Sequence, residues 1–277
     1  MSKQEKKSQE VVVQQTAEVS VLDQHTGEQE ILNSDVVIPR ILLQQGLSEF
    51  VSERKKSPAG QLIAQGDMVK STTADILGNP ESPVEFIPLK MTTSWILKEK
   101  IGGKYEFRSI EPRTAFNEDA PWDFVKNGAD WKRVKALNVF VLLPKDIENF
   151  HKEMEQAAKS GGIPDLSKAL LPAQISFQST SFNAGRAVAT FYAQLRDMLR
   201  YNPGIKPYHY TLTLKCKQDK NDKGSYYVFD VGSPKKLDQK LVDEASRWYT
   251  ILNTLKDIRV DTSGDDEAAP IQGSTHF

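Results

Sequence analysis

The strongest apolar run in the sequence, Val134–Leu143, constrains the fold more than any other feature. Its residues are apolar on both of the faces that a strand would present, with only Lys135 and Asn138 as polar exceptions. Such a run predicts a central strand that is buried on both sides. A strand of this kind needs neighbouring strands and a covering layer above and below it. With 39% hydrophobic residues among 277, the chain can supply a core of that size.

Alternating and glycine-punctuated segments predict further strands around this one. Gly102-Gly103 separates the strand-like segments 95–101 and 104–110 and predicts a hairpin. Segments 208–217 and 225–231 predict a second antiparallel pair across a polar turn.

Helices are predicted over 146–160, from an N-cap at Asn183 to about Arg200, and from Ser233-Pro234 to about Asp257. The segment 111–130 is expected to be a long loop. Because strands follow one another rather than alternate with helices, the fold class is predicted to be α+β. We expect a mainly antiparallel sheet in an OB-like barrel, with helical insertions and a C-terminal helix.

Charge divides the chain into three parts. Residues 1–35 carry a net charge of −4 and residues 261–277 carry −4, whereas residues 36–260 carry +7. We predict a disordered acidic N-terminal arm over 1–35 and a single nucleic-acid-binding domain over 36–260. An acidic flexible tail is expected over 261–277. Two solvated tails on an ordinary domain are the plainer interpretation of the same pattern.

Several function classes are disfavoured. The sequence has no apolar stretch of membrane-spanning length and no secretory signal, and its single cysteine, Cys216, excludes an intramolecular disulfide and a zinc site built on cysteines. It also lacks the common hydrolase, metalloprotease, phosphate-loop and dinucleotide-binding motifs. We therefore expect a cytoplasmic protein that is not an enzyme and uses no cofactor or metal.

Basic and aromatic residues alternate along three of the predicted strands, at 104–108, 131–135 and 208–217. Single-stranded nucleic acid is bound by rings that stack on bases and by cations that follow the phosphates, so these segments predict such a site. For any one aromatic residue on a strand, a place in the core is the commoner role. The candidate binding residues are Lys104, Arg108, Trp122, Trp131, Lys132, Arg133, His209, Lys215, Lys217 and Tyr226.

Two further segments are candidates. The start of the predicted helix near Gly185 and Arg186 offers backbone N–H groups that could hold a phosphate, although a plain capped helix explains it as well. The C-terminal tail combines an acidic cluster with a terminal aromatic residue. Its candidate partner-binding residues are Asp265, Asp266, Glu267 and Phe277.

With its acidic tail and terminal Phe, the chain resembles phage-encoded single-stranded DNA-binding proteins of replication and recombination modules. Three internal segments resemble a group of uncharacterised phage proteins that are often placed near replication genes. The internal segments are Ile38-Pro39-Arg40-Ile41-Leu42-Leu43-Gln44, Gly66-Asp67 and the run from Phe177 to Arg186. This resemblance covers about residues 36–232. It implies an OB-like barrel that binds DNA without sequence preference, and a tail that recruits replication or recombination proteins.

Two alternatives stay open. A phage structural or assembly protein would use Trp95, Trp122 and Trp131 as anchors in protein interfaces. A single-strand annealing protein would bind DNA and also form rings or filaments. The sequence leaves the oligomeric state open, including a homo-oligomer.

Overall fold

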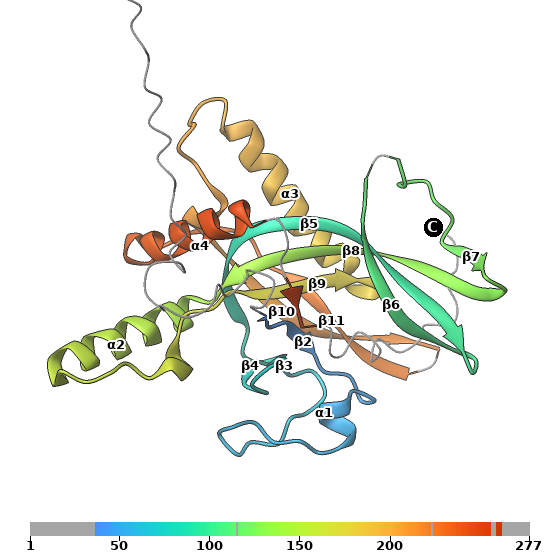
Figure 1. The fold of residues 1–277 in the computed structure, drawn as a ribbon, viewed down its shortest axis with the longest axis horizontal. Helices are drawn as coiled ribbons and strands as arrows, with labels where there is room; N and C mark the ends of the chain where they lie inside the picture. The colour runs from blue at the N-terminus through green and yellow to red at the C-terminus, as the bar shows by residue number, and fades with distance from the viewer. Residues whose placement is uncertain (1–36, 115, 223, 256–258, 262–277) are drawn as a thin grey trace, which may run out of the picture. The chain divides into compact units, whose positions relative to one another are not determined.

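In a computed structural model of the protein, the structure describes residues 37–114, 116–222, 224–255 and 259–261 (Figure 1). All of them belong to one unit, residues 33–277. The strands are β1 Val37–Ile38, β2 Ile41–Leu43, β3 Met68–Lys70, β4 Ile76–Gly78, β5 Val84–Ile101, β6 Lys104–Pro112, β7 Asp123–Lys126, β8 Ala129–Leu142, β9 Ala173–Gln178, β10 Tyr210–Asn221, β11 Gly224–Val231, β12 Lys235–Lys236 and β13 Arg259–Val260. The α-helices are α1 Glu49–Ser52, α2 Pro144–Ser160, α3 Phe182–Met198 and α4 Val242–Thr254.

The main sheet is antiparallel and is built on the two long strands β5 and β8, which pair with each other along most of their length. Their other partners divide the sheet into two parts. In the core half, β10 pairs with the start of β5 and β9 pairs with the end of β8, and β11 continues the sheet beyond β10. In the sheet extension, β6 pairs with residues 94–101 of β5 and β7 pairs with residues 129–132 of β8.

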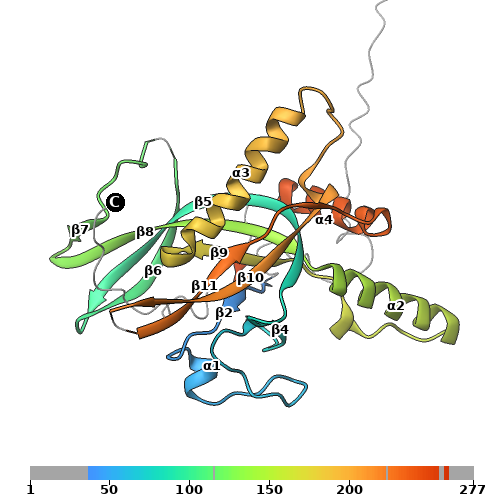
Figure 2. The ribbon, with the colours of Figure 1, turned by 180° about the vertical axis from the view of Figure 1, so that it is seen from behind.

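Helices cover both faces of the core half, as a two-sided central strand requires. Leu137 and Val139 of β8 pack in one cluster with Val188 of α3. Phe140, on the opposite face of the strand, packs in a second cluster with Leu252 of α4. Figures 1 and 2 show α3 and α4 as separate helices at different places beside the long strands. The prediction of a central strand buried on both sides is confirmed.

Two tight turns organise the sheet extension. Gly102 and Gly103, with φ of 56° and 86°, join β5 to β6 as predicted. Asn127 and Gly128, with φ of 54° and 79°, join β7 to β8. Two consecutive positive φ values are what a two-residue hairpin turn requires, and Asn-Gly is a favoured sequence for it. The expectation of a loop over 111–130 is therefore wrong for its second half.

Two helix starts also differ from prediction. Helix α3 begins at Phe182 with Ser181 as its N-cap residue, so Asn183 is not the cap. The Ser181 hydroxyl instead accepts a hydrogen bond from the Phe229 backbone N–H at 3.2 Å, which ties the helix start to β11. Ser233-Pro234 starts no helix, because the next two residues form β12 against β10 and α4 begins only at Val242. The C-terminal helix itself is confirmed.

The mixed α+β class and the largely antiparallel sheet are confirmed, whereas closure into an OB-like barrel is not. At the β9 edge, an isolated parallel β-bridge pairs Gln174 of β9 with Arg40, the residue before β2. At the other edge, the Gln45 side chain binds the Tyr227 backbone of β11. Its Nε2 donates to the carbonyl at 2.8 Å, and its Oε1 accepts from the N–H at 3.0 Å. An isolated backbone bridge at one edge and a side chain at the other thus stand where a closed barrel would have continuous backbone ladders.

Some expectations concern residues that the structure does not describe. The predicted arm over 1–35 lies outside the described residues, as do Asp265, Asp266, Glu267 and Phe277 of the tail. Among the helices that are described, none has the length and apolar character needed to cross a membrane.

Candidate nucleic-acid interface

One face of the sheet extension carries alternating aromatic and basic side chains. The register pairs Phe124 of β7 with Trp131 of β8. Residues two apart on a strand share a face, so Lys126, Arg133 and Lys135 lie on the same face as this pair. Trp122, just before β7, joins them through its contact with Lys135. We call this set the aromatic–cation row, and its members are Trp122, Phe124, Lys126, Trp131, Arg133 and Lys135.

The cations of the row lie over its rings. Phe124 and Trp131 are stacked, with ring centroids 6.1 Å apart and an interplanar angle of 30°. The Arg133 guanidinium carbon lies 3.9 Å from the Phe124 centroid, and the Lys126 Nζ lies 5.1 Å from that of Trp131. Both rings are half-buried, so part of each remains open to solvent. The row therefore offers π-surface and positive charge side by side.

At the other end of the row, Lys135 lies between two tryptophans. Its Nζ is 5.2 Å from the centroid of Trp95 and 5.7 Å from that of Trp122. Trp95 is fully buried, whereas Trp122 is 53% exposed. The two indoles meet edge to face at 6.1 Å. At this end of the row, Trp95 thus lies buried beneath Lys135, and Trp122 is the ring that a ligand can reach.

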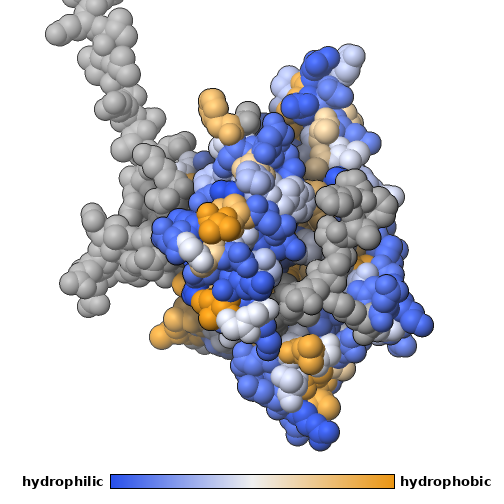
Figure 3. Space-filling view, turned by 90° about the vertical axis from the view of Figure 1, so that its right-hand side faces the viewer, coloured by the Kyte–Doolittle hydropathy of each residue, from blue (hydrophilic) through white to orange (hydrophobic). Residues whose placement is uncertain are grey.

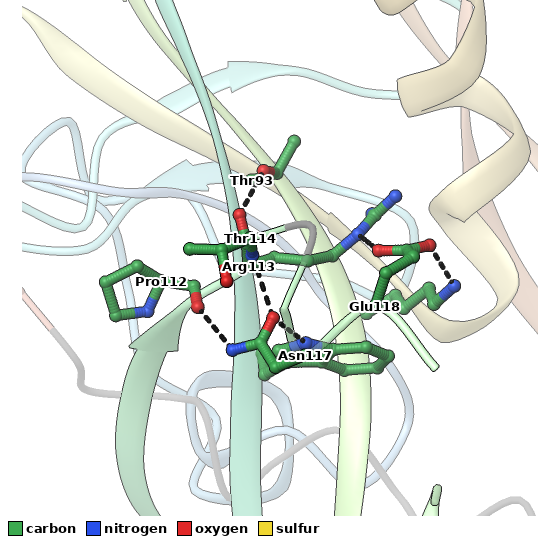
Figure 4. A network of polar contacts seen from close by, with 8 residues as sticks. Thr93, Pro112, Arg113, Thr114, Asn117 and Glu118 are labelled. Carbon is green, nitrogen blue, oxygen red and sulfur yellow. Dashed lines mark hydrogen bonds and ion pairs between the residues drawn. The ribbon is translucent and has the colours of Figure 1, made fainter. Parts of the chain in front are cut away.

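A carboxylate occupies the same end (Figure 4). Glu118 Oε1 accepts a hydrogen bond from Lys135 Nζ at 2.7 Å, and its other oxygen accepts one from Arg113 Nε. The hydrogen bond from Lys135, followed by that from Arg113, holds the pKa of the Glu118 carboxyl below its usual value. Both cations are therefore paired with one acidic side chain, which offsets one of their two positive charges.

Asn117 holds the segment that carries Glu118 against the sheet (Figure 4). Its Oδ1 accepts hydrogen bonds from the Thr114 backbone N–H at 2.8 Å and from Trp95 Nε1–H at 3.2 Å. Its Nδ2 donates to the Pro112 carbonyl at 2.9 Å. The amide thus closes a turn and satisfies the one polar atom of a buried indole, which would be costly to leave unpaired.

The structure separates the predicted residues of the extension. Trp122, Trp131 and Arg133 belong to the row. Lys132 lies on the opposite face of β8, with its Nζ 5.9 Å from the Tyr105 centroid. Arg108 sits at a bulge in β6 and pairs with Glu99 at 2.6 Å, while Lys104 is exposed beside the hairpin turn. Lys132 is therefore not part of the row, because consecutive strand residues point to opposite faces.

Lys215, Lys217 and Tyr226 lie on β10 and β11, whose strand partners do not include β7 or β8. Strand β10 pairs with β5 only at Val84–Phe86, before the segment of β5 that carries Trp95. The two lysines are exposed on the face opposite the buried Leu214 and Cys216, and so opposite the face of the row. Lys217 approaches Asp230 at 3.9 Å, and the Tyr226 hydroxyl donates to Asp219 at 3.3 Å. The structure does not bring these residues together with the row.

His209 and Arg186 have local roles. His209 Nδ1 accepts a hydrogen bond from the Lys206 N–H at 3.1 Å in a short helical turn, Pro207–His209. Burial, and then the charges of Lys206 and Lys236, lower the pKa of His209, so protonation is disfavoured.

Arg186 is exposed on α3, over the ring of Phe182. Its neighbour Gly185 is explained by packing, because a Cβ there would lie 2.7 Å from that of Phe177. A phosphate is not needed to account for that glycine.

Sequence reasoning missed Phe124, Lys126 and Lys135 as members of the site. The Asn127-Gly128 pair was the available signal, because a hairpin turn there places Phe124 opposite Trp131. Trp95, a candidate interface anchor, is buried and has no surface to offer a partner.

The search for relatives gives no further guide to the site, since no family model, curated protein or solved structure matches this chain. Within the described part of the chain, no group of three or more His, Cys, Asp or Glu side chains could hold a metal ion. The arrangement of the row is suited to binding an extended, negatively charged ligand that has flat rings.

Proposed function

We propose that this protein binds single-stranded DNA and coats it without sequence preference during replication or recombination. The observation that carries the proposal is the aromatic–cation row on an open face of the sheet. Stacking on a ring tolerates every base, and cations beside the rings can follow the phosphates. A sheet face with this composition is a common platform for single strands.

The magnitudes are sufficient. Three rings of the row, Trp122, Phe124 and Trp131, are exposed or half-buried. Each stacked base contributes roughly 1–3 kcal/mol, so three would supply roughly 3–9 kcal/mol before any phosphate contact. A micromolar dissociation constant corresponds to about 8 kcal/mol. Stacking and phosphate contacts together are thus enough for functional affinity.

Finer features belong to the same proposal. The β2–β4 sheet and the core half enclose one cluster that contains Ile41, Met68 and Phe86, which fits an OB-like arrangement held by side chains at its edges. We further propose a phage origin, action in the cytoplasm of the infected cell, and partner recruitment by the C-terminal tail through Asp265, Asp266, Glu267 and Phe277.

The direct test is fluorescence-anisotropy titration of a labelled dT oligomer and of a matched duplex, at low and moderate salt. Trp131→Ala should weaken binding to the dT oligomer by roughly 5- to 150-fold, the loss of one stacked base. Tyr201→Ala is the matched control, because Tyr201 is an aromatic residue that is 90% exposed outside the row. Absence of binding by the wild-type protein, or an equal loss in both variants, would overturn the proposal.

A second candidate is a phage assembly protein that acts through protein contacts. The sheet extension and the segment after β6 carry four exposed apolar side chains, those of Ile101, Ile110, Phe116 and Val125. Figure 3, which views this end of the molecule, shows apolar patches set among hydrophilic surface. Indifference to DNA together with large symmetric assemblies in electron micrographs would favour this function. Rings or filaments that accelerate strand pairing would instead favour an annealing protein.

A further inference from the structure

Two cations from different segments share one carboxylate at the Trp122 end of the row. Arg113 follows β6 and Lys135 lies on β8, and each binds a different oxygen of Glu118. The Arg113 and Lys135 side chains are 21% and 22% exposed, whereas that of Glu118 is 37% exposed. The acidic side chain is therefore the most exposed of the three.

The carboxylate leaves part of the binding capacity of these cations unused. Arg113 Nη1 is buried and has no acceptor among the described residues. A carboxylate has two oxygens, and both are already engaged with Arg113 Nε and Lys135 Nζ. A phosphate group offers additional oxygens and suits a guanidinium beside an ammonium. Lys135 also contacts the accessible ring of Trp122, so a phosphate bound there would lie next to a stacking surface.

We propose that Arg113 and Lys135 form a phosphodiester-binding site and that the Glu118 carboxylate occupies it until nucleic acid displaces it. This inference rests on the proposed function and deepens it by assigning one phosphate position at the end of the row. Rotation of the Glu118 side chain is sufficient to vacate the site, because Asn117 holds the adjoining segment through its own hydrogen bonds. The cost of breaking these ion pairs lowers the affinity of the wild-type protein for DNA.

Glu118→Gln tests the site, because it keeps the shape of the side chain and removes its charge. Asp119→Asn is the matched control, since Asp119 is the next residue, is exposed, and loses the same charge. We expect Glu118→Gln to tighten dT oligomer binding by roughly two- to thirtyfold, the range for two partly exposed ion pairs. Asp119→Asn should change the affinity for the dT oligomer by less than about twofold. Adding Lys135→Ala to Glu118→Gln should abolish the gain.

A second measurement separates this inference from the proposed function. Inorganic phosphate is titrated while the Trp95 indole N–H resonance is followed by NMR, because that ring lies 5.2 Å from Lys135 Nζ. The Trp95 resonance should shift at a lower phosphate concentration in Glu118→Gln than in the wild type or in Asp119→Asn. If the two variants behave alike in both titrations, the site is overturned, even where dT binding upholds the proposed function. If DNA fails to bind but phosphate acts selectively on Glu118→Gln, the site stands and the proposed function falls.

Discussion

The core half and the sheet extension are built from the same two strands, yet they differ in what covers them. In the core half, residues 137–142 of β8 are all buried, between a cluster that includes α3 and a cluster that includes α2 and α4. In the extension, the buried cluster consists of Ile96, Val134 and Ala136, with Phe107 packed against it and no helical residue. Along β8, which pairs without interruption from Trp131 to Phe140, strand alternation continues from one half to the other.

The difference shows how one sheet can separate stability from binding. Where helices cover the strands, apolar side chains contribute to the free energy of folding. Where no such layer lies over them, rings stay partly exposed and are lined by cations, as Phe124 is by Arg133. Substitutions in the core half should therefore change stability, and substitutions in the row should change ligand affinity.

The sharpest test compares two phenylalanines, one from each half. Phe177 of β9 is fully buried and lies 5.8 Å from the Phe229 ring, so Phe177→Ala should lower the free energy of unfolding by about 3–5 kcal/mol. Phe124→Ala should cost less than about 1.5 kcal/mol, because that ring is half-buried. Urea denaturation measures both. Equal losses would break the distinction between the halves.

A smaller effect is expected from the contact between α3 and the sheet. Gly185→Ala places a Cβ 2.7 Å from the Phe177 Cβ and 2.9 Å from Leu137 Cδ1, and should cost about 1–3 kcal/mol of unfolding free energy through overpacking. Ala187→Ser, on the exposed side of the same helix, should stay within about 0.5 kcal/mol. Thermal or urea unfolding of both variants measures the two losses of unfolding free energy. A neutral Gly185→Ala would mean that the helix can move away from the sheet at little cost.

A third comparison is between two basic residues. Arg133 belongs to the row, whereas Lys217 lies on β10 of the core half. If Arg133 contacts a phosphate, Arg133→Ala should reduce the slope of log affinity against log salt by about 0.7, the value for one contact with a single strand. Lys217→Ala should leave that slope unchanged. Anisotropy titrations of a dT oligomer over a salt series measure both, and the reverse result would move the binding face to β10 and β11.

The smallest effect concerns pH. The folded-state pKa of Glu118 is lowered, first by Lys135 and then by Arg113, so its ion pairs stabilise the fold above the pKa of an unfolded carboxyl, about 4.3. That contribution is lost as the pH falls through the folded-state pKa. The difference in unfolding free energy between wild type and Glu118→Gln should therefore be constant above about pH 5 and shrink below it.

The effect is small because the Glu118 side chain is 37% exposed and water screens it. Urea denaturation at a series of pH values provides the measurement, with Asp119→Asn as control. A difference between wild type and Glu118→Gln that did not change with pH would argue against these ion pairs.

Local features were predictable wherever the signal is contained in a few neighbouring residues. The hairpin at Gly102-Gly103 and the pair β10–β11 follow from glycine, turn and alternation patterns. The start of α3 was not predictable in this way, because the Ser181 hydroxyl binds Phe229, 48 residues away. Membership of the site was only partly predictable for the same reason, since Glu118 meets Lys135 across 17 residues.

The sequence by itself determined the Gly102-Gly103 hairpin, the β10–β11 pair, the two-sided burial of the central run and the presence of alternating rings and cations. Only the tertiary structure decided which of those rings remain accessible. Trp95 and Trp122 touch each other, yet one is fully buried and the other is 53% exposed. Periodicity is a property of the chain's own geometry and can be recognised locally. Burial depends on which distant segment lies on top, and here Asn117 and Glu118 place that segment over Trp95 and Lys135.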